Sequence, residues 1–482
     1  MAQKNGHGQK LSCFKLTGIA IGSTIASGAF SLSGDMAAAG AGTGAVLTGW
    51  CLCGLGMLAM VLCFYQLNKV RPDLTGGVYS YAREGFGDYV GFNSAWGYWI
   101  SNFLANVSFG TLMFAAAGQF LPVFGQGNNL ISIICASAVT WLSVLLVLKG
   151  VETAAIVNLI VTFAKLIPIL LFVLAVIFYR AFDPQIFRMN FFGEDTGMPF
   201  SQQVAATTYT TAWAFIGVEG AVVVSGRAKR PGDVGKATVI SYLTVLLIYV
   251  SISVLSMGVM TRGELAQLGN PPLAYVFTQV AGPLGGALIN AGVVLSLLGA
   301  TLVHVIISTE CAYEAAAKGS FCRAFASVNR KGSPVFALLV TNGLVQIFLI
   351  IVYINASTYQ IFYTISTSMM VIPYLLSAMY CWRLAACDGQ RLISRGVNPG
   401  RAWAVAVAGT GYGLWLLYSG KLTGLMVSVL LYAPGTLVYI KGKKEQGQRP
   451  FAQMRDKILL TGVLSLFVIC LALLGKGIIH PF

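Results

Sequence analysis

The sequence has few charged residues, and it is poorest in acidic ones. Only 10% of the 482 residues are charged, and sixteen of these are aspartate or glutamate. Soluble domains carry about 25% charged residues, so this composition excludes an ordinary soluble globular protein. Apolar residues make up 56% of the chain, and runs long enough to cross a hydrocarbon core of about 30 Å recur along its length. We therefore predict an all-α polytopic membrane protein.

Cysteine and histidine form no recognisable metal or redox site. The ten cysteines include no CxxC pair, and the chain has only three histidines. An HExxH motif, a nucleophile elbow and paired carboxylates are also missing, so we expect no metal, no cofactor and no enzyme activity. The cysteines are best interpreted as small buried hydrophobic residues.

Thirteen apolar segments are long enough to be membrane spans. No cleavable signal peptide is expected before them, because the first segment lacks a small-residue cleavage site. Nothing in the sequence indicates a separate soluble domain. The segments cover roughly residues 16–37, 43–66, 91–120, 128–148, 152–179, 205–226, 237–259, 285–316, 333–354, 358–382, 402–418, 421–440 and 458–475.

The positive charges orient these spans. With a cytoplasmic N-terminus, 25 lysines and arginines fall in inside segments and 5 in outside segments, while Lys165 lies within a span. This asymmetry follows the positive-inside rule, supports thirteen spans and predicts an extracytoplasmic C-terminus. The net charge of +15 is thus spread along the cytoplasmic face of a lipid bilayer and does not indicate nucleic acid. We expect a multi-pass protein of the cell membrane.

The first span is interrupted by the small-residue stretch Gly22-Ser23-Thr24-Ile25-Ala26-Ser27-Gly28. Glycine and serine weaken a helix, and non-helical backbone at membrane depth is tolerated only inside protein or along a cavity. The stretch therefore predicts a binding site near the bilayer midplane. The alternative is close helix packing through small residues.

The sixth span shows a matching interruption, because Gly217 and Gly220 flank Glu219. Breaks in spans one and six are what an inverted repeat of five plus five helices would produce. We expect one transporter domain, residues 1–482, with repeats at 16–179 and 205–382 and additional spans at 402–475. Half-helix N-termini would hold a carboxylate and free carbonyls an ammonium group, which suits an amino acid.

Titratable residues inside spans are costly and usually functional. Lys165 lies in the fifth span, Glu219 in the sixth, and His304 and Glu310 in the eighth. Lys165 and Glu219 are candidates for proton coupling. A purely structural ion pair between them is the alternative.

A loop signature makes the assignment more specific. Together with the two breaks, it resembles the amino acid/polyamine/organocation transporters in register over spans one to ten. Within that superfamily the chain is similar to the basic amino acid/polyamine antiporters, and most to the arginine/ornithine antiporters. The thirteenth span and residues 298–303, which lead to Glu310, favour this subgroup. The motifs are GSTIASGAF in span one, AFIGVEG in span six, and Pro72-Asp73-Leu74-Thr75-Gly76-Gly77-Val78-Tyr79-Ser80-Tyr81 with the following Phe86-Gly87, Gly91-Phe92 and Trp96-Gly97-Tyr98-Trp99.

The resemblance implies a LeuT-like fold with discontinuous helices 1 and 6, and it implies a role for each matching residue. The span-one break would bind the substrate carboxylate, an aromatic of span six would cover the substrate, and nearby carbonyls would take its ammonium group. A span-five lysine would replace sodium, and a span-three tyrosine would belong to the cytoplasmic gate. The matching residues are Ser23, Thr24, Ser27 and Gly28 (carboxylate), Trp213 (cover), Ala214 and Ile216 (ammonium), Tyr98 with its polar neighbours Ser101, Asn102 and Asn106, and Lys165, Glu219 and Glu310 for coupling or gating.

Two positions depart from the family pattern. Relatives often have Gly-Ser-Gly at the first break, whereas this chain has Ala26-Ser27-Gly28. His304 stands where arginine exchangers tend to carry a tryptophan, which holds a cation by cation–π contact. Histidine does this less well, so His304 either contacts the substrate differently or only bonds a neighbouring helix.

The combined interpretation is a sodium-independent exchanger of cationic amino acids, such as arginine and ornithine, that works by alternating access. One alternative is a proton-coupled amino acid symporter. Another is exchange of a different amino acid with its decarboxylation product, for example histidine with histamine. The resemblance is also compatible with a homodimer.

Overall fold

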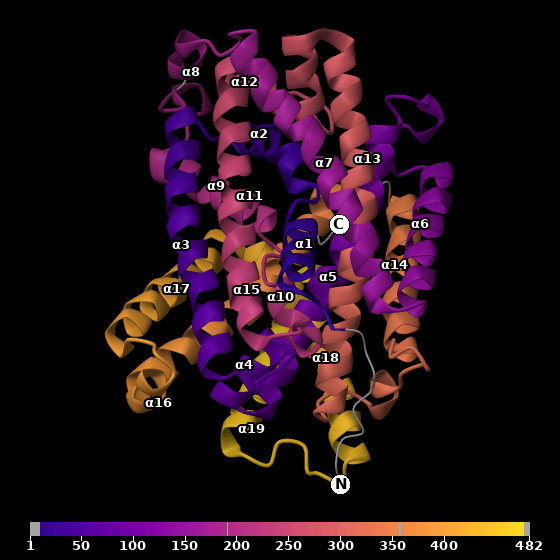
Figure 1. Ribbon diagram of the computed structural model, residues 1–482, viewed down its shortest axis with the longest axis vertical. Coiled ribbons are helices and arrows are strands. Elements are labelled where there is room, and N and C mark those ends of the chain that lie inside the picture. Colours follow the sequence, from indigo (N-terminus) through magenta and orange to yellow (C-terminus); the bar gives the residue numbers. More distant parts are fainter. Residues whose placement is uncertain (1–9, 190, 356–358, 477–482) are drawn as a thin grey trace.

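The computed structural model describes residues 10–189, 191–355 and 359–476. Within these ranges the regular secondary structure is helical, which confirms the predicted all-α class (Figure 1). The longer helices are α1 (Cys13–Thr24), α2 (Gly28–Ala38), α3 (Thr43–Val70), α5 (Asp88–Ala117), α6 (Leu130–Leu148), α7 (Val151–Phe178), α9 (Phe200–Ala214), α11 (Pro231–Val259), α13 (Pro272–Ala317), α14 (Val335–Asn355), α15 (Tyr359–Cys387), α17 (Pro399–Ser419), α18 (Lys421–Glu445) and α19 (Met454–Gly475). The shorter ones are α4 (Val78–Phe86), α8 (Pro184–Met189), α10 (Gly220–Val223), α12 (Arg262–Ala266), α16 (Gly389–Ser394) and the 3-10 turns η1 (Pro122–Phe124), η2 (Glu194–Thr196), η3 (Ser225–Arg227) and η4 (Arg323–Ala326).

Eleven helical segments of the described ranges are long and apolar enough to cross a membrane, which agrees with a polytopic protein. Two of the predicted spans are not among them. Residues 205–226 are divided between α9 and α10, and α17 is long enough but less apolar. The count of thirteen therefore stays a prediction. Some of the predictions fall outside the described residues. These concern Lys4, which is one of the 25 inside charges, both ends of the chain, and the start of the predicted span at residue 358.

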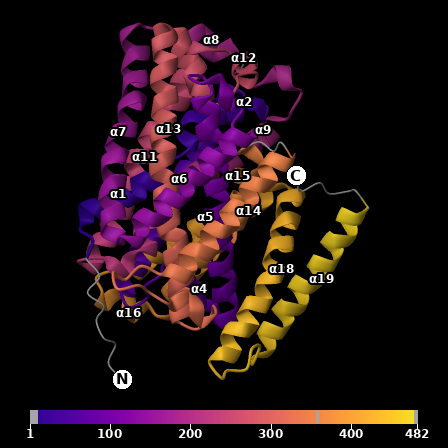
Figure 2. The ribbon, with the colours of Figure 1, turned by 90° about the vertical axis from the view of Figure 1, so that its right-hand side faces the viewer.

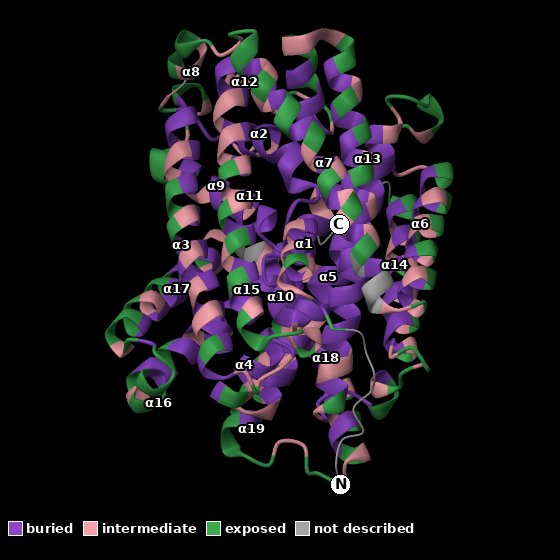
Figure 3. Ribbon diagram, in the orientation of Figure 1, coloured by how far each residue is buried: buried purple, intermediate pink, exposed green. Residues whose placement is uncertain are grey.

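Burial divides the helices into a core and a periphery. In the most apolar 18-residue stretch of each segment, 94% of the residues are buried in α5 and 89% in the α1–α2 segment. In α19 only 6% of them are buried. Buried residues accordingly fill the centre of the molecule (Figure 3). Figure 2 shows α18 and α19 running side by side at the edge of the bundle. The substrate site is therefore expected among α1, α5, α9 and α13, and α19 presents its side chains to lipid.

The two predicted breaks are real interruptions and they touch. α1 ends at Thr24 and α2 begins at Gly28, while α9 ends at Ala214 and α10 begins at Gly220. The Ser23 hydroxyl donates to the carbonyl oxygen of Gly217 at 2.6 Å, so the breaks lie side by side near mid-height of the bundle (Figure 1). The inverted five-plus-five repeat and its domain limits remain predictions.

Reporter fusions test whether α17 crosses the membrane. We expect a fusion after Ser394 to make a cytoplasmic fluorescent reporter active, and a fusion after Gly420 to make an extracytoplasmic phosphatase active, because the positive charges place these points on opposite sides. A fusion after Gln448 serves as a further cytoplasmic control. If the Ser394 and Gly420 fusions report the same side, α17 is not a span and the thirteen-span topology is wrong.

Candidate functional site

The first break is held open by side chains from neighbouring helices. The Lys165 ammonium of α7 donates to the carbonyl oxygen of Gly22 at 2.9 Å and to that of Ile25. Ser296 of α13 donates to Ile25 at 3.1 Å. Tyr249 of α11 donates to the carbonyl oxygen just before the break at 2.6 Å. Carbonyls that a continuous helix would satisfy internally are thus satisfied by α7, α11 and α13.

Glycine is required where the two breaks meet. Gly217 has a φ of +102°, and a Cβ there would lie 2.8 Å from the carbonyl oxygen of Ser23. Gly28 approaches α9 closely, because a Cβ at this position would lie 3.1 Å from Cα of Ala214. Ala26 is outside the left-handed region, so its methyl group fits the backbone of the break without strain.

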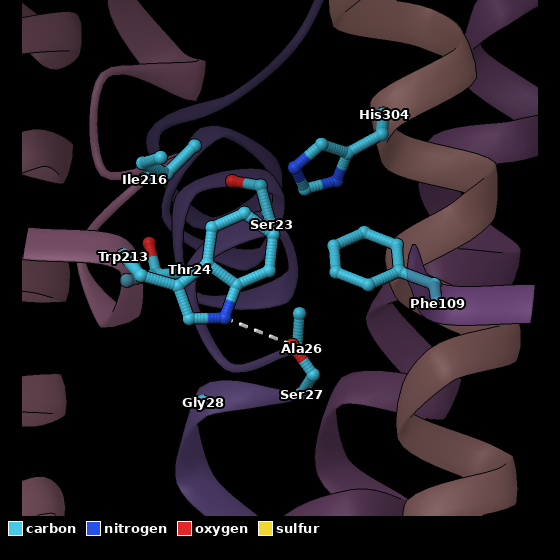
Figure 4. Close-up of a pocket in the computed structure, with 9 residues that line it drawn as sticks. All are labelled: Ser23, Thr24, Ala26, Ser27, Gly28, Phe109, Trp213, Ile216 and His304. Carbon is cyan, nitrogen blue, oxygen red and sulfur yellow. Dashed lines mark hydrogen bonds between the residues drawn. The ribbon is translucent and has the colours of Figure 1, made fainter. Parts of the chain in front are cut away.

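Trp213 closes one side of the junction. Its indole N–H donates to the Ser27 hydroxyl at 3.2 Å, and its ring stacks on Tyr363 of α15 with centroids 5.2 Å apart. The indole faces the ring of Phe109 across the junction (Figure 4). These contacts join α9 to α15 and to Ser27, the residue that precedes α2.

A small cavity, called here the central cavity, lies between the two breaks (Figure 4). Its volume is about 10 Å³, which is room for about one water molecule. An amino acid can enter only after the surrounding helices or side chains move apart. The lining residues are Ser23, Thr24, Ala26, Ser27, Gly28, Phe109, Trp213, Ile216 and His304.

His304 reaches the central cavity from α13 with one nitrogen unused. Its Nδ1 lies 3.0 Å from the carbonyl oxygen of Ala300. Since a carbonyl only accepts, Nδ1 carries the proton in the neutral ring and Nε2 is an acceptor. Among the described residues Nε2 has no hydrogen-bond partner. The ring packs edge-on against Phe109 at 4.9 Å and points toward the first break (Figure 4).

Glu219 is the residue that precedes α10 at the second break, and it is fully buried. Its carboxylate accepts hydrogen bonds from Tyr374 of α15 and from the backbone N–H of Gly217 at 3.1 Å. Tyr98 of α5 is another neighbour of the Glu219 carboxylate. Lys165 makes no ion pair with Glu219 among the bridges of the described residues. The alternative of a Lys165–Glu219 pair is therefore not realised in this conformation.

The other polar residues predicted for the site lie apart from the central cavity. Ser101 exchanges hydrogen bonds with Ser366, and Asn102 donates to the backbone of its own helix at 2.8 Å. Both amide atoms of Asn106 are buried without a partner in the described part of the chain. Ala214 also does not line the cavity, although its backbone contacts Gly28. Sequence reasoning missed Phe109, Tyr363 and Tyr374, since single aromatics in apolar spans carry no distinguishing signal.

The C-terminal end of α13 is tied to elements from both halves of the chain. Glu310 accepts hydrogen bonds from Arg227, which follows α10, with a shortest distance of 2.9 Å. Lys318 donates to the backbone of Thr75 at 2.5 Å and to Ser80 at 2.6 Å, both within the loop motif. Burial lowers the pKa of Lys318. These bonds join α13 to the loop motif and to η3, which follows the second break.

Substitution of Gly217 by alanine tests the junction. We expect the free energy of unfolding to fall by about 1–3 kcal/mol, because alanine is strained at this φ and its Cβ meets Ser23. Gly343→Ala in α14 is the matched control, since nothing lies within 4 Å of its Cβ and alanine favours a helix. Thermal unfolding of the purified proteins measures both changes. Equal melting temperatures for the two variants would contradict the close approach of Gly217 to Ser23.

Comparisons with known proteins identify the family. A family model described as amino acid permease matches residues 11–464. The chain is 41% identical over 469 residues to the arginine/ornithine antiporter of Pseudomonas aeruginosa, covering 95% of this chain and 96% of the relative. It is 37% identical over 477 residues to the arginine/agmatine antiporter of Chlamydia caviae, covering 96% of each. Identity to the arginine/agmatine antiporter of Chlamydia pneumoniae is 35% over 488 residues and 99% of each chain. The chain therefore belongs to the amino acid permease family, within the amino acid/polyamine/organocation superfamily, and is an amino acid exchanger of that superfamily.

Proposed function

We propose that this protein exchanges cationic amino acids across the cell membrane by alternating access, without sodium, and that arginine and ornithine are its substrates. The observation that carries the proposal is the central cavity, which lies between two helix breaks and is closed on both sides. The names of the antiporter relatives supply the substrate pair. Their lengths match this chain almost completely, so the whole transport unit is comparable.

The two breaks offer opposite charges to the two ends of an amino acid. The N-terminus of α2 begins at Gly28 beside the cavity, and its first N–H groups have no partners within the helix. These groups and the helix dipole attract a carboxylate. The carbonyl oxygens of Ala214 and Ile216 accept no hydrogen bond within the described ranges, which suits an ammonium group. Ser23, Thr24 and Ser27 add polar contacts around the carboxylate end.

In the central cavity the substrate side chain would contact aromatic and imidazole rings. The described residues that line the cavity include no carboxylate. Phe109, Trp213 and His304 are the ring-bearing residues that line the cavity. The aromatic faces attract a guanidinium or ammonium group by cation–π interaction, and Nε2 of neutral His304 accepts a hydrogen bond from it. Asn106 lies one turn before Phe109 on α5, and its amide has no hydrogen-bond partner among the described residues, so it can bond the substrate once the helices separate. A site without a fixed negative charge suits exchange of one cation for another.

Lys165 accounts for the proposed sodium independence. Its ammonium group is fully buried and donates to two backbone carbonyl oxygens at the first break. Backbone carbonyls are typical ligands of alkali cations at broken membrane helices. A fixed ammonium supplies the positive charge that a bound sodium ion would otherwise bring.

Closure on both sides suits alternating access. Trp213 with Ser27 and Tyr363 closes the outer side, while Glu219 with Tyr374 and Tyr98 closes the inner side. In our proposal one set of contacts breaks at a time. An empty carrier reorients too slowly to contribute to transport. Glu310 and Arg227 act as a cytoplasmic latch between α13 and η3.

Counterflow in proteoliposomes tests exchange directly. We expect uptake of labelled arginine only when the vesicles contain unlabelled arginine or ornithine, because the return step requires a loaded carrier. The rate should not change when external sodium is replaced by potassium or choline, since Lys165 occupies the cation position. Uptake into empty vesicles driven by a pH gradient alone would favour the proton symporter over the exchanger.

His304 is expected to determine side-chain preference. His304→Phe keeps a ring against Phe109 but removes the acceptor, so the KM for arginine should rise about tenfold, the usual effect of losing a hydrogen bond to a charged group. Competition by ornithine, lysine, agmatine, histidine and histamine against labelled arginine shows whether the ranking changes. Thr309→Val, which alters a buried hydroxyl of the same helix outside the cavity lining, is the control. An unchanged KM and ranking in His304→Phe would exclude His304 from substrate contact.

A further inference from the structure

A second hollow lies far from the two breaks, where α18 and α19 meet the junction of α4 and α5. It is called here the cytoplasmic pocket and has a volume of about 420 Å³. The residues that carry the following argument are Asp88, Lys443, Arg449, Ala452, Arg455 and Asp456, all of which line it. The proposed transport function does not use this pocket.

The pocket carries an excess of positive charge. Asp88 is paired twice, with Lys443 at 2.5 Å and with Arg83 at 2.6 Å. Arg449 is exposed and makes no ion pair among the described residues. Arg455 is half exposed and lies against the backbone of Gly87. Arg449 is therefore available to an anion, and Arg455, whose one ion pair in the described part of the chain is the 3.7 Å contact with Asp456, can turn a second guanidinium group toward it. Arginine binds phosphate in a bidentate manner.

Asp456 adds a buried acceptor to the same pocket. Its side chain is 7% exposed, and within the described ranges its Oδ1 has no hydrogen-bond partner. The nearest cation, Arg455, is 3.7 Å away, which is too long for a hydrogen bond. Buried carboxylate oxygens normally accept hydrogen bonds, so the pocket also requires a donor. An occupant that combines an anionic group with an N–H or O–H group matches both features of the pocket.

The position of the pocket indicates where this occupant comes from. The apolar segments Gly424–Glu445 and Met454–Gly475 both end beside it, which places it at the predicted cytoplasmic surface of the bilayer. The α18–α19 hairpin is at the edge of the bundle (Figure 2), and the apolar α19 is only 6% buried within the structure. Basic pockets at this level are suited to phospholipid headgroups.

We propose that the cytoplasmic pocket binds the headgroup of a membrane phospholipid that carries a hydrogen-bond donor. The phosphate contacts Arg449 and Arg455, and the donor of the headgroup bonds Oδ1 of Asp456. Ethanolamine and glycerol headgroups supply such a donor, whereas choline has none. The binding holds the α18–α19 hairpin against the α4–α5 junction.

Native mass spectrometry of the full chain, loaded with phospholipids of identical acyl chains, tests the proposal. We expect phosphatidylethanolamine and phosphatidylglycerol to remain bound and phosphatidylcholine to bind about tenfold more weakly, because only the first two satisfy Asp456. Arg449→Gln should lower binding of both lipids about tenfold. Ala452→Glu, which adds a negative charge at an exposed position of the pocket lining, should do the same.

The matched control is Lys457→Gln, which removes one positive charge from an exposed position outside the pocket lining. Its lipid binding should equal that of the unaltered chain. The proposal is overturned if Lys457→Gln and Arg449→Gln lose lipid equally, which would indicate general attraction, or if phosphatidylcholine binds as well as the others. Displacement of lipid by inorganic phosphate or glycerophosphoethanolamine at equal concentration would assign the pocket to a soluble anion and overturn the lipid origin.

Discussion

The structure depends on how backbone carbonyls at the first break are satisfied inside an apolar bundle. An unpaired carbonyl at membrane depth costs several kcal/mol, so a broken helix needs partners from its neighbours. Lys165, Ser296 and Tyr249 supply these partners from three different helices. The break is thereby fixed relative to α7, α11 and α13, and every later feature of the site depends on that placement.

With the first break fixed, the second is fixed by contact with it. Ser23 bonds Gly217, and Gly28 packs against Ala214, so neither broken segment can shift without the other. This coupling explains why small residues recur at the junction. They permit close backbone approach, and the remaining polar groups of the backbone stay free to face a ligand. The packing explanation of these glycines is therefore confirmed, and the binding-site explanation is compatible with it and stays a proposal.

In the proposed function, the central cavity recognises a cation without a counter-ion. A carboxylate beside the substrate would have to be neutralised whenever the site was empty, and charges in the membrane interior are costly. Aromatic rings and the Nε2 atom of His304 attract a cation while remaining neutral themselves. The chain differs here from a tryptophan-based site, since His304 offers directional hydrogen bonding from a tautomer that Ala300 fixes.

The sequence alone determined the membrane class, the apolar segments and the position of both breaks, because hydropathy and glycine content are local properties. It also identified Lys165, Glu219 and His304 as unusual for their surroundings, and the family resemblance added Trp213. Only the tertiary structure decided what these residues contact, since Lys165 bonds the carbonyl oxygen of Gly22, 143 positions away, and Glu219 bonds Tyr374, 155 positions away. It also revealed Phe109 and the closed state of the cavity, and it left Ser101 and Asn102 in helix contacts. The physical reason is that side-chain direction and helix packing decide which residues meet, and neither is written in any single segment.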